Sequence, residues 1–266
     1  MLPPFRQFCF SAVYFKGSIS KTVTAINLAD ILVRDYKKRV ILADCDGQMN
    51  LTRFYLPEFD PYVNYSMVSL LMGDGESVWS DNLMPLMPDL DLIPASPELY
   101  DMDLHAIRDG MIQNGVGVSA RVAEFVDSAR EDDGEDFFIF DCPPGFTVAS
   151  VGALLASDEV IIPMLLDGFS HTGMEDMQRQ ISNLQQARHG IQISGVLLTQ
   201  WRNSEVVRQG EQLICSMGVP VYKQTIRRMD KVPESTYDQS PITQYSPKSA
   251  ASIDYRAWVR EFLGEV

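Results

Sequence analysis

Few residues of the kind that build metal or disulfide centres occur in the sequence. Its 266 residues include four cysteines and three histidines. The cysteines form no C-x-x-C pair and the histidines have no ligand-like spacing, so neither a zinc site nor a disulfide framework is indicated. We interpret all seven as ordinary core or surface residues and expect a reducing, cytoplasmic environment. The seven are Cys9, Cys45, Cys142, Cys215, His105, His171 and His189.

Long hydrophobic runs are missing too. No run approaches the roughly 18 residues needed to cross a bilayer, and residues 1–6 lack the basic-then-apolar order of a secretory signal. With 45% hydrophobic residues, the chain can still bury a full core. We expect a single domain over residues 1–266, in which residues 1–6 form a short tail, and no membrane partner.

Positive charge is scarce. The formal net charge is −14 at pH 7, which argues against a broad nucleic-acid-binding face. The deficit is uneven, because residues 1–200 carry 13 Lys and Arg against 28 Asp and Glu, whereas residues 201–266 carry 9 against 8. Any surface that contacts DNA is therefore expected in the last quarter of the chain. A normally mixed surface there is an equal alternative.

One segment near the N-terminus has the layout of a phosphate-binding loop. An apolar run over residues 7–15 leads into it, and helical spacing over residues 21–38 follows. In such a unit the loop amides and helix N-terminus face the phosphate, a lysine reaches the terminal phosphates, and a threonine can hold Mg²⁺. Lys21 and Thr22 fit the pattern G-x-x-x-x-G-K-[ST], but Phe15 and Ser20 replace both glycines. The loop alone is a weak match.

Carboxylates follow two further apolar runs. The run ending in Asp44 is followed by Asp46, Gln48 and Asn50, and the run ending in Asp141 is followed by a Pro-Pro-Gly turn. Ligands of open parallel sheets bind at the carboxyl ends of the strands. These carboxylates are therefore expected beside the loop, where they can orient Mg²⁺ from a neighbouring strand. A solvated loop with helix-capping side chains is the alternative for residues 44–50.

Strand and helix patterns alternate along the chain, which predicts an α/β fold: a doubly wound, mostly parallel sheet with helices on both faces. Helices are predicted over residues 21–38, 66–72, 118–129 and 205–217, around Met174 to Leu184, and at the C-terminus. We interpret Met174 and Met177 as core residues. Strands are predicted over residues 7–15, 39–44, 90–95, 137–141, 158–164, 193–199 and 219–226.

With these residues assembled, the chain resembles the ParA/Soj/MinD family of deviant Walker ATPases, and ParA-type partition proteins most closely, over about residues 8–263. The resemblance implies the P-loop NTPase fold. Five ordered motifs are far more specific than the loop alone. They correspond to the family's KGGVGKTT loop, its D-x-D-x-Q-x-N, D-C-P-P and A-D-x-V-I-I-P segments and its closing pattern, at residues 16–23, 44–50, 141–144, 157–163 and 226–249.

The resemblance implies roles for single residues. Lys21 would bind the β- and γ-phosphates, Lys16 would reach the partner's nucleotide across an ATP-sandwiched dimer, and Asp46 would position the attacking water. These three are the expected catalytic residues. The expected metal-site residues are Thr22, Asp44, Asp46 and Asp141. The expected nucleotide-binding residues are Lys16, Gly17, Ser18, Ile19, Ser20, Lys21, Thr22, Val23, Gln200, Ile226 and Arg227.

Three departures from the family pattern bear on activity. Ser20 replaces a glycine at a position where a left-handed backbone or close phosphate approach is needed. A residue with a side chain costs on the order of 1 kcal/mol in the left-handed conformation. We therefore expect weakened but not abolished ATP binding. Ser18 replaces the second glycine, where the two subunits come close, and Gly47 stands where ParA proteins usually have proline.

The resemblance implies a slow ATPase that binds ATP and Mg²⁺, forms a homodimer, and partitions a plasmid, chromosome or mobile element with a ParB-like partner. Non-specific DNA binding would be weak and salt-dependent. One alternative is a nucleotide-binding adaptor that hydrolyses ATP poorly or not at all. A second is a MinD-like membrane-positioning ATPase, which needs a basic amphipathic C-terminal helix. The expected DNA-binding residues are Arg227, Arg228, Lys231, Lys248, Arg256 and Arg260.

Overall fold

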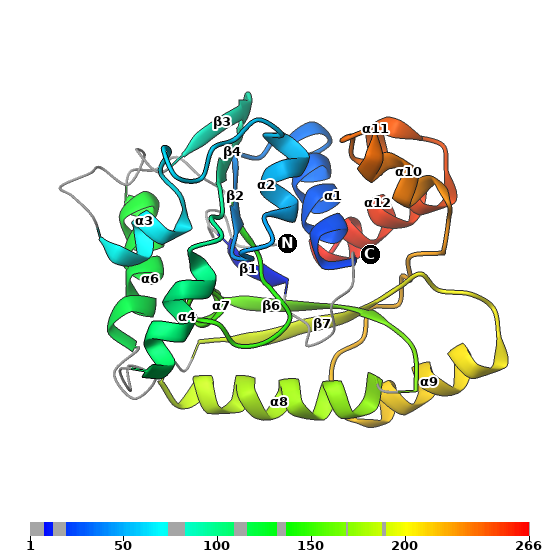
Figure 1. Ribbon diagram of the computed structural model, residues 1–266. Coiled ribbons are helices and arrows are strands. Elements are labelled where there is room, and N and C mark those ends of the chain that lie inside the picture. Colours follow the sequence, from blue (N-terminus) through cyan, green and yellow to red (C-terminus); the bar gives the residue numbers. More distant parts are fainter. Residues whose placement is uncertain are drawn as a thin grey trace.

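The structure is a computed structural model that describes most of the chain. The described residues are 8–12, 20–73, 83–108, 116–131, 137–168, 170–187 and 190–265. Seven strands within these residues form one sheet in the order β3-β4-β2-β5-β1-β6-β7 (Figure 1). The strands are β1 (Phe8–Ala12), β2 (Val40–Asp44), β3 (Met84–Met87), β4 (Leu90–Ile93), β5 (Phe137–Asp141), β6 (Glu159–Leu165) and β7 (Gln192–Thr199).

All neighbouring strands run parallel except β3, which pairs antiparallel with β4. The central strand β5 is buried along its whole length, as a parallel strand covered on both faces must be. Its side chains alternate between the two faces, with Phe138 and Phe140 in one core cluster and Phe137 and Ile139 in the other. The predicted doubly wound α/β architecture is confirmed.

Helices cover both faces of the sheet (Figure 1). One face packs against α1 (Ser20–Arg34), α2 (Asn50–Tyr55), α11 (Ile242–Tyr245) and α12 (Ala250–Phe262). Beside α11 lies α10 (Lys231–Tyr237). The other face packs against α3 (Met67–Met72), α4 (Leu99–Arg108), α6 (Val116–Glu131), α7 (Val148–Ala156), α8 (Ser170–Ala187) and α9 (Glu205–Ser216).

Most of the predicted elements are confirmed with small shifts at their ends. Ser204 accepts a hydrogen bond from the backbone N–H of Val207 and so caps α9 as expected, and Met174 and Met177 are fully buried in the core. The sequence patterns missed β3, α2, α4, α7, α10 and α11. All five of these helices have ten residues or fewer and carry too few turns for a clear apolar period.

The strand predicted over residues 219–226 is wrong. Only isolated bridges join this region to the edge of the sheet, at Val196–Val221 and Trp201–Arg227. The N–H groups of Tyr222 and Ile226 reach carbonyls of β7, but the N–H groups of Lys223 and Gln224 bind the Glu261 carboxylate at 2.8 and 2.9 Å. The segment therefore leaves the register of β7 between its two points of contact.

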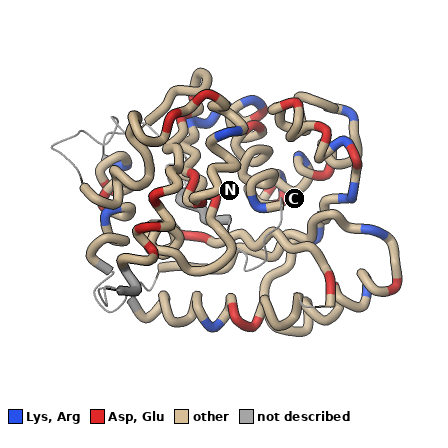
Figure 2. Tube along the Cα trace, viewed as in Figure 1, with Lys and Arg blue, Asp and Glu red and all other residues tan. Residues whose placement is uncertain are grey.

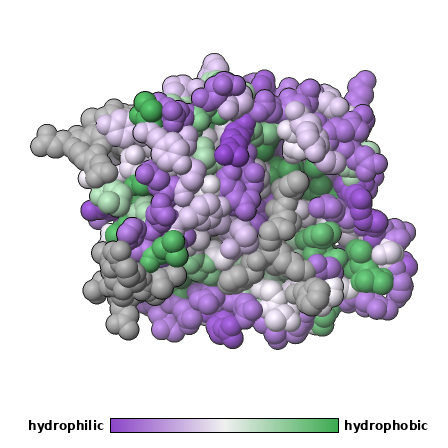
Figure 3. Space-filling model, in the orientation of Figure 1, coloured by the Kyte–Doolittle hydropathy of each residue, from purple (hydrophilic) through white to green (hydrophobic). Residues whose placement is uncertain are grey.

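The C-terminal helix α12 bears on the MinD-like alternative, which needs a basic amphipathic helix at that end of the chain. Three apolar residues of α12, Tyr255, Trp258 and Val259, are buried in the core. Hydrophobic residues are exposed instead where α9 begins (Figure 3), and Val206 there has 72% of its surface accessible. Among the described residues, no helix is long and apolar enough to cross a membrane.

We predict that Phe138→Ala will lower the free energy of unfolding by about 3–5 kcal/mol, because it removes a fully buried ring from the centre of the sheet. Phe138 is 1% exposed and packs edge-on against Phe125 at a centroid distance of 6.3 Å. Urea unfolding measures the change.

Ile253→Ala on α12 is the matched control, because Ile253 is 52% exposed. It should change stability by no more than about 0.5 kcal/mol. Equal effects of the two substitutions would contradict this assignment of the core.

Candidate functional site

Three adjacent strands bring the predicted site residues to one edge of the sheet. β5 lies between β1 and β2, and Asp141 pairs in register with Ala12 on one side and with Asp44 on the other. The segment that follows β1 leads into α1, whose first turn carries Lys21 and Thr22. The sheet therefore places both carboxylates beside the start of α1, at the carboxyl edge where ligands of such folds bind.

A short hydrogen bond joins α1 to this edge. Thr22 Oγ1 donates to Asp141 Oδ2 at 2.6 Å. Lys21, one residue earlier, is buried. Burial lowers the pKa of its ammonium below the usual value, and the nearby Asp141 and Asp46 offset only part of this shift. The predicted lysine, threonine and strand carboxylate are thus brought together.

Asp141 is the carboxylate whose charge is least well balanced. Burial raises its pKa to about 8, with a further rise from Asp44, against the lowering effects of Thr22 and Lys21. Its second oxygen, Oδ1, is buried and accepts no hydrogen bond from the described residues. Positive charge bound at this point would stabilise the ionised form.

Asp44 is also fully buried but is better supplied with donors. Its Oδ2 accepts hydrogen bonds from the backbone N–H and the hydroxyl of Thr52, both at 2.8 Å, and its Oδ1 accepts from the backbone N–H of Asp46 at 3.1 Å. Burial still raises its pKa to about 6. Asp44 therefore anchors the start of α2 to the end of β2.

The turn between β2 and α2 presents Asp46. Asp46 is half-buried and accepts the N–H of Gln48 at 2.9 Å, and Met49 closes the turn with a left-handed backbone at φ 60°. A Cβ at Gly47 would come within 2.8 Å of the Tyr100 ring. A side chain at position 47 would therefore require the exposed Tyr100 ring to move.

A cavity of about 650 Å³ collects the phosphate-side residues. It lies between the start of α1, the β2–α2 turn, α2 and the end of α10. Its lining residues are Lys21, Thr22, Val23, Ile26, Asp46, Gln48, Asn50, Arg53, Phe54, Pro144, Thr236 and Gln239. Lys21, Thr22 and Asp46 thus face one space, as their predicted roles require.

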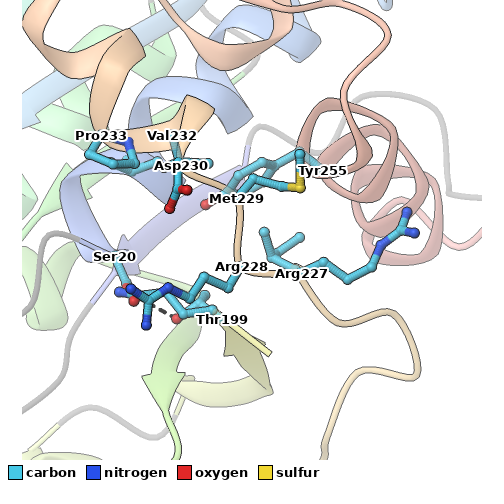
Figure 4. Close-up of a pocket in the computed structure, with 12 residues that line it drawn as sticks. Ser20, Thr199, Arg227, Arg228, Met229, Asp230, Val232, Pro233 and Tyr255 are labelled. Atoms are coloured by element: carbon cyan, nitrogen blue, oxygen red, sulfur yellow. Dashed lines mark hydrogen bonds between the residues drawn. The ribbon is translucent and has the colours of Figure 1, made fainter. Parts of the chain in front are cut away.

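A second cavity, of about 210 Å³, lies beyond the start of α1 (Figure 4). Val23 lines both cavities, while Gln200, Ile226 and Arg227 line only this one. In Figure 4 the Arg227 side chain extends away toward α12, where it forms a two-pronged ion pair with Asp254 at 2.7 and 2.8 Å. The backbone of Arg227, and not its guanidinium, therefore faces the cavity.

The expected strain at Ser20 is wrong. Ser20 is the first residue of α1, and it is absent from the described residues with positive φ. Its hydroxyl is buried and lies 3.0 Å from Thr199 Oγ1. A side chain fits here because the helix has already begun, so the backbone argument for weakened ATP binding does not hold. The effect of Ser20 through close phosphate approach stays a prediction.

Several predicted residues lie outside the described part of the chain. They are the tail at residues 1–6 and the loop residues Lys16, Gly17, Ser18 and Ile19. The in-trans role of Lys16 and the effect of Ser18 at a dimer face therefore stay predictions.

The six predicted DNA-binding residues differ in whether they have an ion-pair partner. Figure 2 shows basic and acidic residues interspersed around α10 and α12. Three are paired: Arg227 with Asp254, Lys231 with Glu234, and Arg256 with Asp35. The other three are exposed and have no ion pair among the described residues: Arg228, Lys248 and Arg260. These three are the cations most available to a polyanion.

The residues suit a magnesium ion held jointly with a phosphate. Within the described ranges no group of three or more His, Cys, Asp or Glu side chains could hold a metal, which excludes a cage of such ligands there. Mg²⁺ usually keeps several waters and takes one or two protein oxygens plus phosphate. Thr22 Oγ1 and the unpaired Asp141 Oδ1 are oxygens of the right kind.

Sequence reasoning missed Thr52 and Arg53. Both follow the recognised Asp44 to Asn50 segment by two or three residues, and the short helix that presents them was not predicted. A hydroxyl directly after a conspicuous acidic segment was the available signal for Thr52. No comparable signal singled out Arg53.

Comparisons with known proteins agree with this geometry. The AAA domain family matches residues 9–193. The chromosome partitioning protein ParA of Caulobacter vibrioides is 28% identical over 251 residues, which is 93% of this chain and 91% of that protein. The structure of apo McdA from Cyanothece superposes with a TM-score of 0.82 at 19% identity and covers 97% of this chain and all of that one.

A second similar structure is that of cobyrinic acid a,c-diamide synthase from Mycobacterium smegmatis, which holds an ATP analogue and magnesium. It has a TM-score of 0.78 at 24% identity and covers 97% of this chain and 95% of that one.

A doubly wound sheet with Lys-Thr at a helix start and carboxylates on the two neighbouring strands defines a P-loop NTPase. The chain belongs to the AAA domain family and, within it, to the ParA/Soj/MinD group of deviant Walker ATPases.

We predict that Thr52→Val will destabilise the protein by about 1–3 kcal/mol, because it removes a hydroxyl donor from the buried Asp44 carboxylate. The same hydroxyl accepts the N–H of Ala95 at 2.9 Å, which valine leaves unpaired. Thermal or urea unfolding measures the change.

Thr172→Val serves as the control, since Thr172 is exposed on α8. If Thr52→Val proves no more destabilising than this control, Asp44 does not depend on Thr52.

Proposed function

We propose that this protein is an ATPase that binds ATP with Mg²⁺ in a single domain and acts in DNA partitioning. The observation that carries the proposal is the Thr22–Asp141 hydrogen bond. It joins the residue that would ligate Mg²⁺ to the carboxylate of the neighbouring strand, in the arrangement that phosphoryl transfer requires. The bound ATP analogue and magnesium of the similar synthase structure support the choice of ligand.

The chain's own residues divide the work between the two cavities. Lys21 binds the β- and γ-phosphates in the larger cavity, and Asp46 orients the attacking water there. Gln200, Ile226 and the backbone of Arg227 hold the base in the smaller cavity. Asp44 keeps α2 in place through Thr52. Bound Mg²⁺ supplies the charge that neutralises the phosphates, and Thr22 and Asp141 are the residues that would hold it.

Assembly and partner follow from the family. In the proposed cycle ATP closes a homodimer, in which Lys16 of each chain reaches the other chain's nucleotide. The dimer binds DNA without sequence preference, and a ParB-like protein stimulates hydrolysis and release in the cytoplasm. The similarity to the chromosome partitioning protein ParA of Caulobacter vibrioides supports the role in partitioning.

We expect the protein to sediment as a dimer with ATP and Mg²⁺ and as a monomer with ADP or without nucleotide. Lys21→Ala should abolish the shift, because it removes the cation that holds the terminal phosphates. Analytical ultracentrifugation under the three conditions tests binding and dimer switching together.

Two outcomes would contradict the proposal in different ways. The absence of any nucleotide effect would remove ATP as the ligand. A dimer that forms with ATP but releases no phosphate over hours, with or without DNA, would favour the nucleotide-binding adaptor.

For DNA binding, we predict that Arg228→Gln, Lys248→Gln and Arg260→Gln will each weaken the ATP-bound dimer's affinity for any duplex sequence. Each should also reduce the slope of log affinity against log salt by about 1, as expected for one lost phosphate contact. Fluorescence anisotropy over a salt series gives both quantities.

Arg256→Gln is the control, because Arg256 is already neutralised by Asp35 at 2.9 Å. If the three unpaired positions behave like Arg256, this face does not contact DNA.

A further inference from the structure

Arg53 is a cation of the larger cavity to which the family resemblance assigned no role. It lies in the last turn of α2 and lines the same space as Lys21, Thr22 and Asp46. Besides Arg53, the only charged residues among the described ones that line this cavity are Lys21 and Asp46. With Arg53, the cavity wall carries two positive charges and one negative charge.

The charge of Arg53 is not balanced by a carboxylate within the described residues. Six other arginines there each pair with an acidic side chain: Arg34, Arg130, Arg179, Arg208, Arg227 and Arg256. The Arg53 side chain is exposed and takes part in no such pair. In a protein of net charge −14, an unpaired arginine on a cavity wall is a binding group for an anion.

The backbone of Arg53 is held firmly relative to the carboxylates. Its N–H donates to the carbonyl of Met49 at 2.8 Å, and its own carbonyl accepts the side-chain amide of Gln239 at 2.9 Å. The preceding residue, Thr52, is bonded to Asp44 by both its N–H and its hydroxyl. The backbone of Arg53 is therefore fixed to the end of β2, and only the Arg53 side chain has to adjust to a ligand.

We propose that Arg53 contacts the terminal phosphate of the nucleoside triphosphate from within the same chain. This inference rests on the proposed function. A guanidinium matches a phosphate with two parallel hydrogen bonds, and a positive charge at the transferring phosphate stabilises the charge that spreads over its oxygens. Arg53 then distinguishes a triphosphate from a diphosphate, because the latter lacks the group it binds.

The test compares Arg53→Gln with Arg53→Lys and with a matched control, Arg208→Gln. Arg208 is an exposed helical arginine on α9, outside both cavities. Titration calorimetry with Mg²⁺ measures the affinity for a non-hydrolysable ATP analogue and, separately, for ADP. Thermal unfolding without nucleotide checks that each variant is folded.

We expect Arg53→Gln to weaken binding of the ATP analogue by about tenfold or more, as for loss of a charged hydrogen bond. ADP affinity should stay within about twofold of the wild type. Arg53→Lys should recover part of the loss, because lysine keeps the charge without the forked geometry. Arg208→Gln should match the wild type for both nucleotides.

Three results would overturn the inference, and they are distinguishable. Wild-type protein that binds neither nucleotide removes the proposed function and this inference together. Wild-type binding with equal losses for ATP analogue and ADP in Arg53→Gln, or no loss, removes the terminal-phosphate contact alone. Unchanged affinity with loss of the ATP-dependent dimer in sedimentation would place Arg53 at the partner subunit instead.

Discussion

Asp44 and Asp141 are buried carboxylates that face each other in register on adjacent strands, so their negative charges repel each other. Burying charge of one sign is unfavourable unless donors or cations offset it. Asp44 obtains its donors from Thr52 and the turn at Asp46. Asp141 accepts a hydrogen bond from Thr22 and is stabilised electrostatically by the positive charge of Lys21. The starts of α1 and α2 are consequently both fixed by the need to balance these two groups.

Much of this frame could be predicted from the sequence, because a buried strand ending in aspartate is a strong local pattern. The uninterrupted apolar residues before Asp44 and Asp141 identified both strands and the edge they share. Residues 219–226 were apolar enough for the same conclusion, but the N–H groups of Lys223 and Gln224 bind Glu261, which lies 38 and 37 residues further along the chain. Competition from a distant side chain leaves no trace in a local pattern. Ser20 was misjudged for a different reason: the motif comparison placed it in the loop, whereas it is the first residue of α1.

The number of charged residues did not predict which cations are available to bind DNA. The last quarter of the chain has nearly balanced charge, yet half of its candidate DNA-binding residues are already engaged. Lys231 illustrates the difference: its ammonium binds Glu234 at 2.6 Å and lies 5.7 Å from the centre of the Tyr245 ring. A cation in such a pair must give up its partner before it binds a phosphate, so its net contribution is small. Only the folded arrangement separates Arg228, Lys248 and Arg260 from the rest.

The short helix α10 forms part of the wall of both cavities. Val232 and Pro233 near its start face the smaller cavity, and Thr236 near its end faces the larger one. A rigid displacement of seven residues therefore alters the width of both spaces at once, and it carries Lys231 along. A molecule long enough to occupy both cavities restrains α10 at both ends, whereas one confined to a single cavity leaves the opposite end free to move.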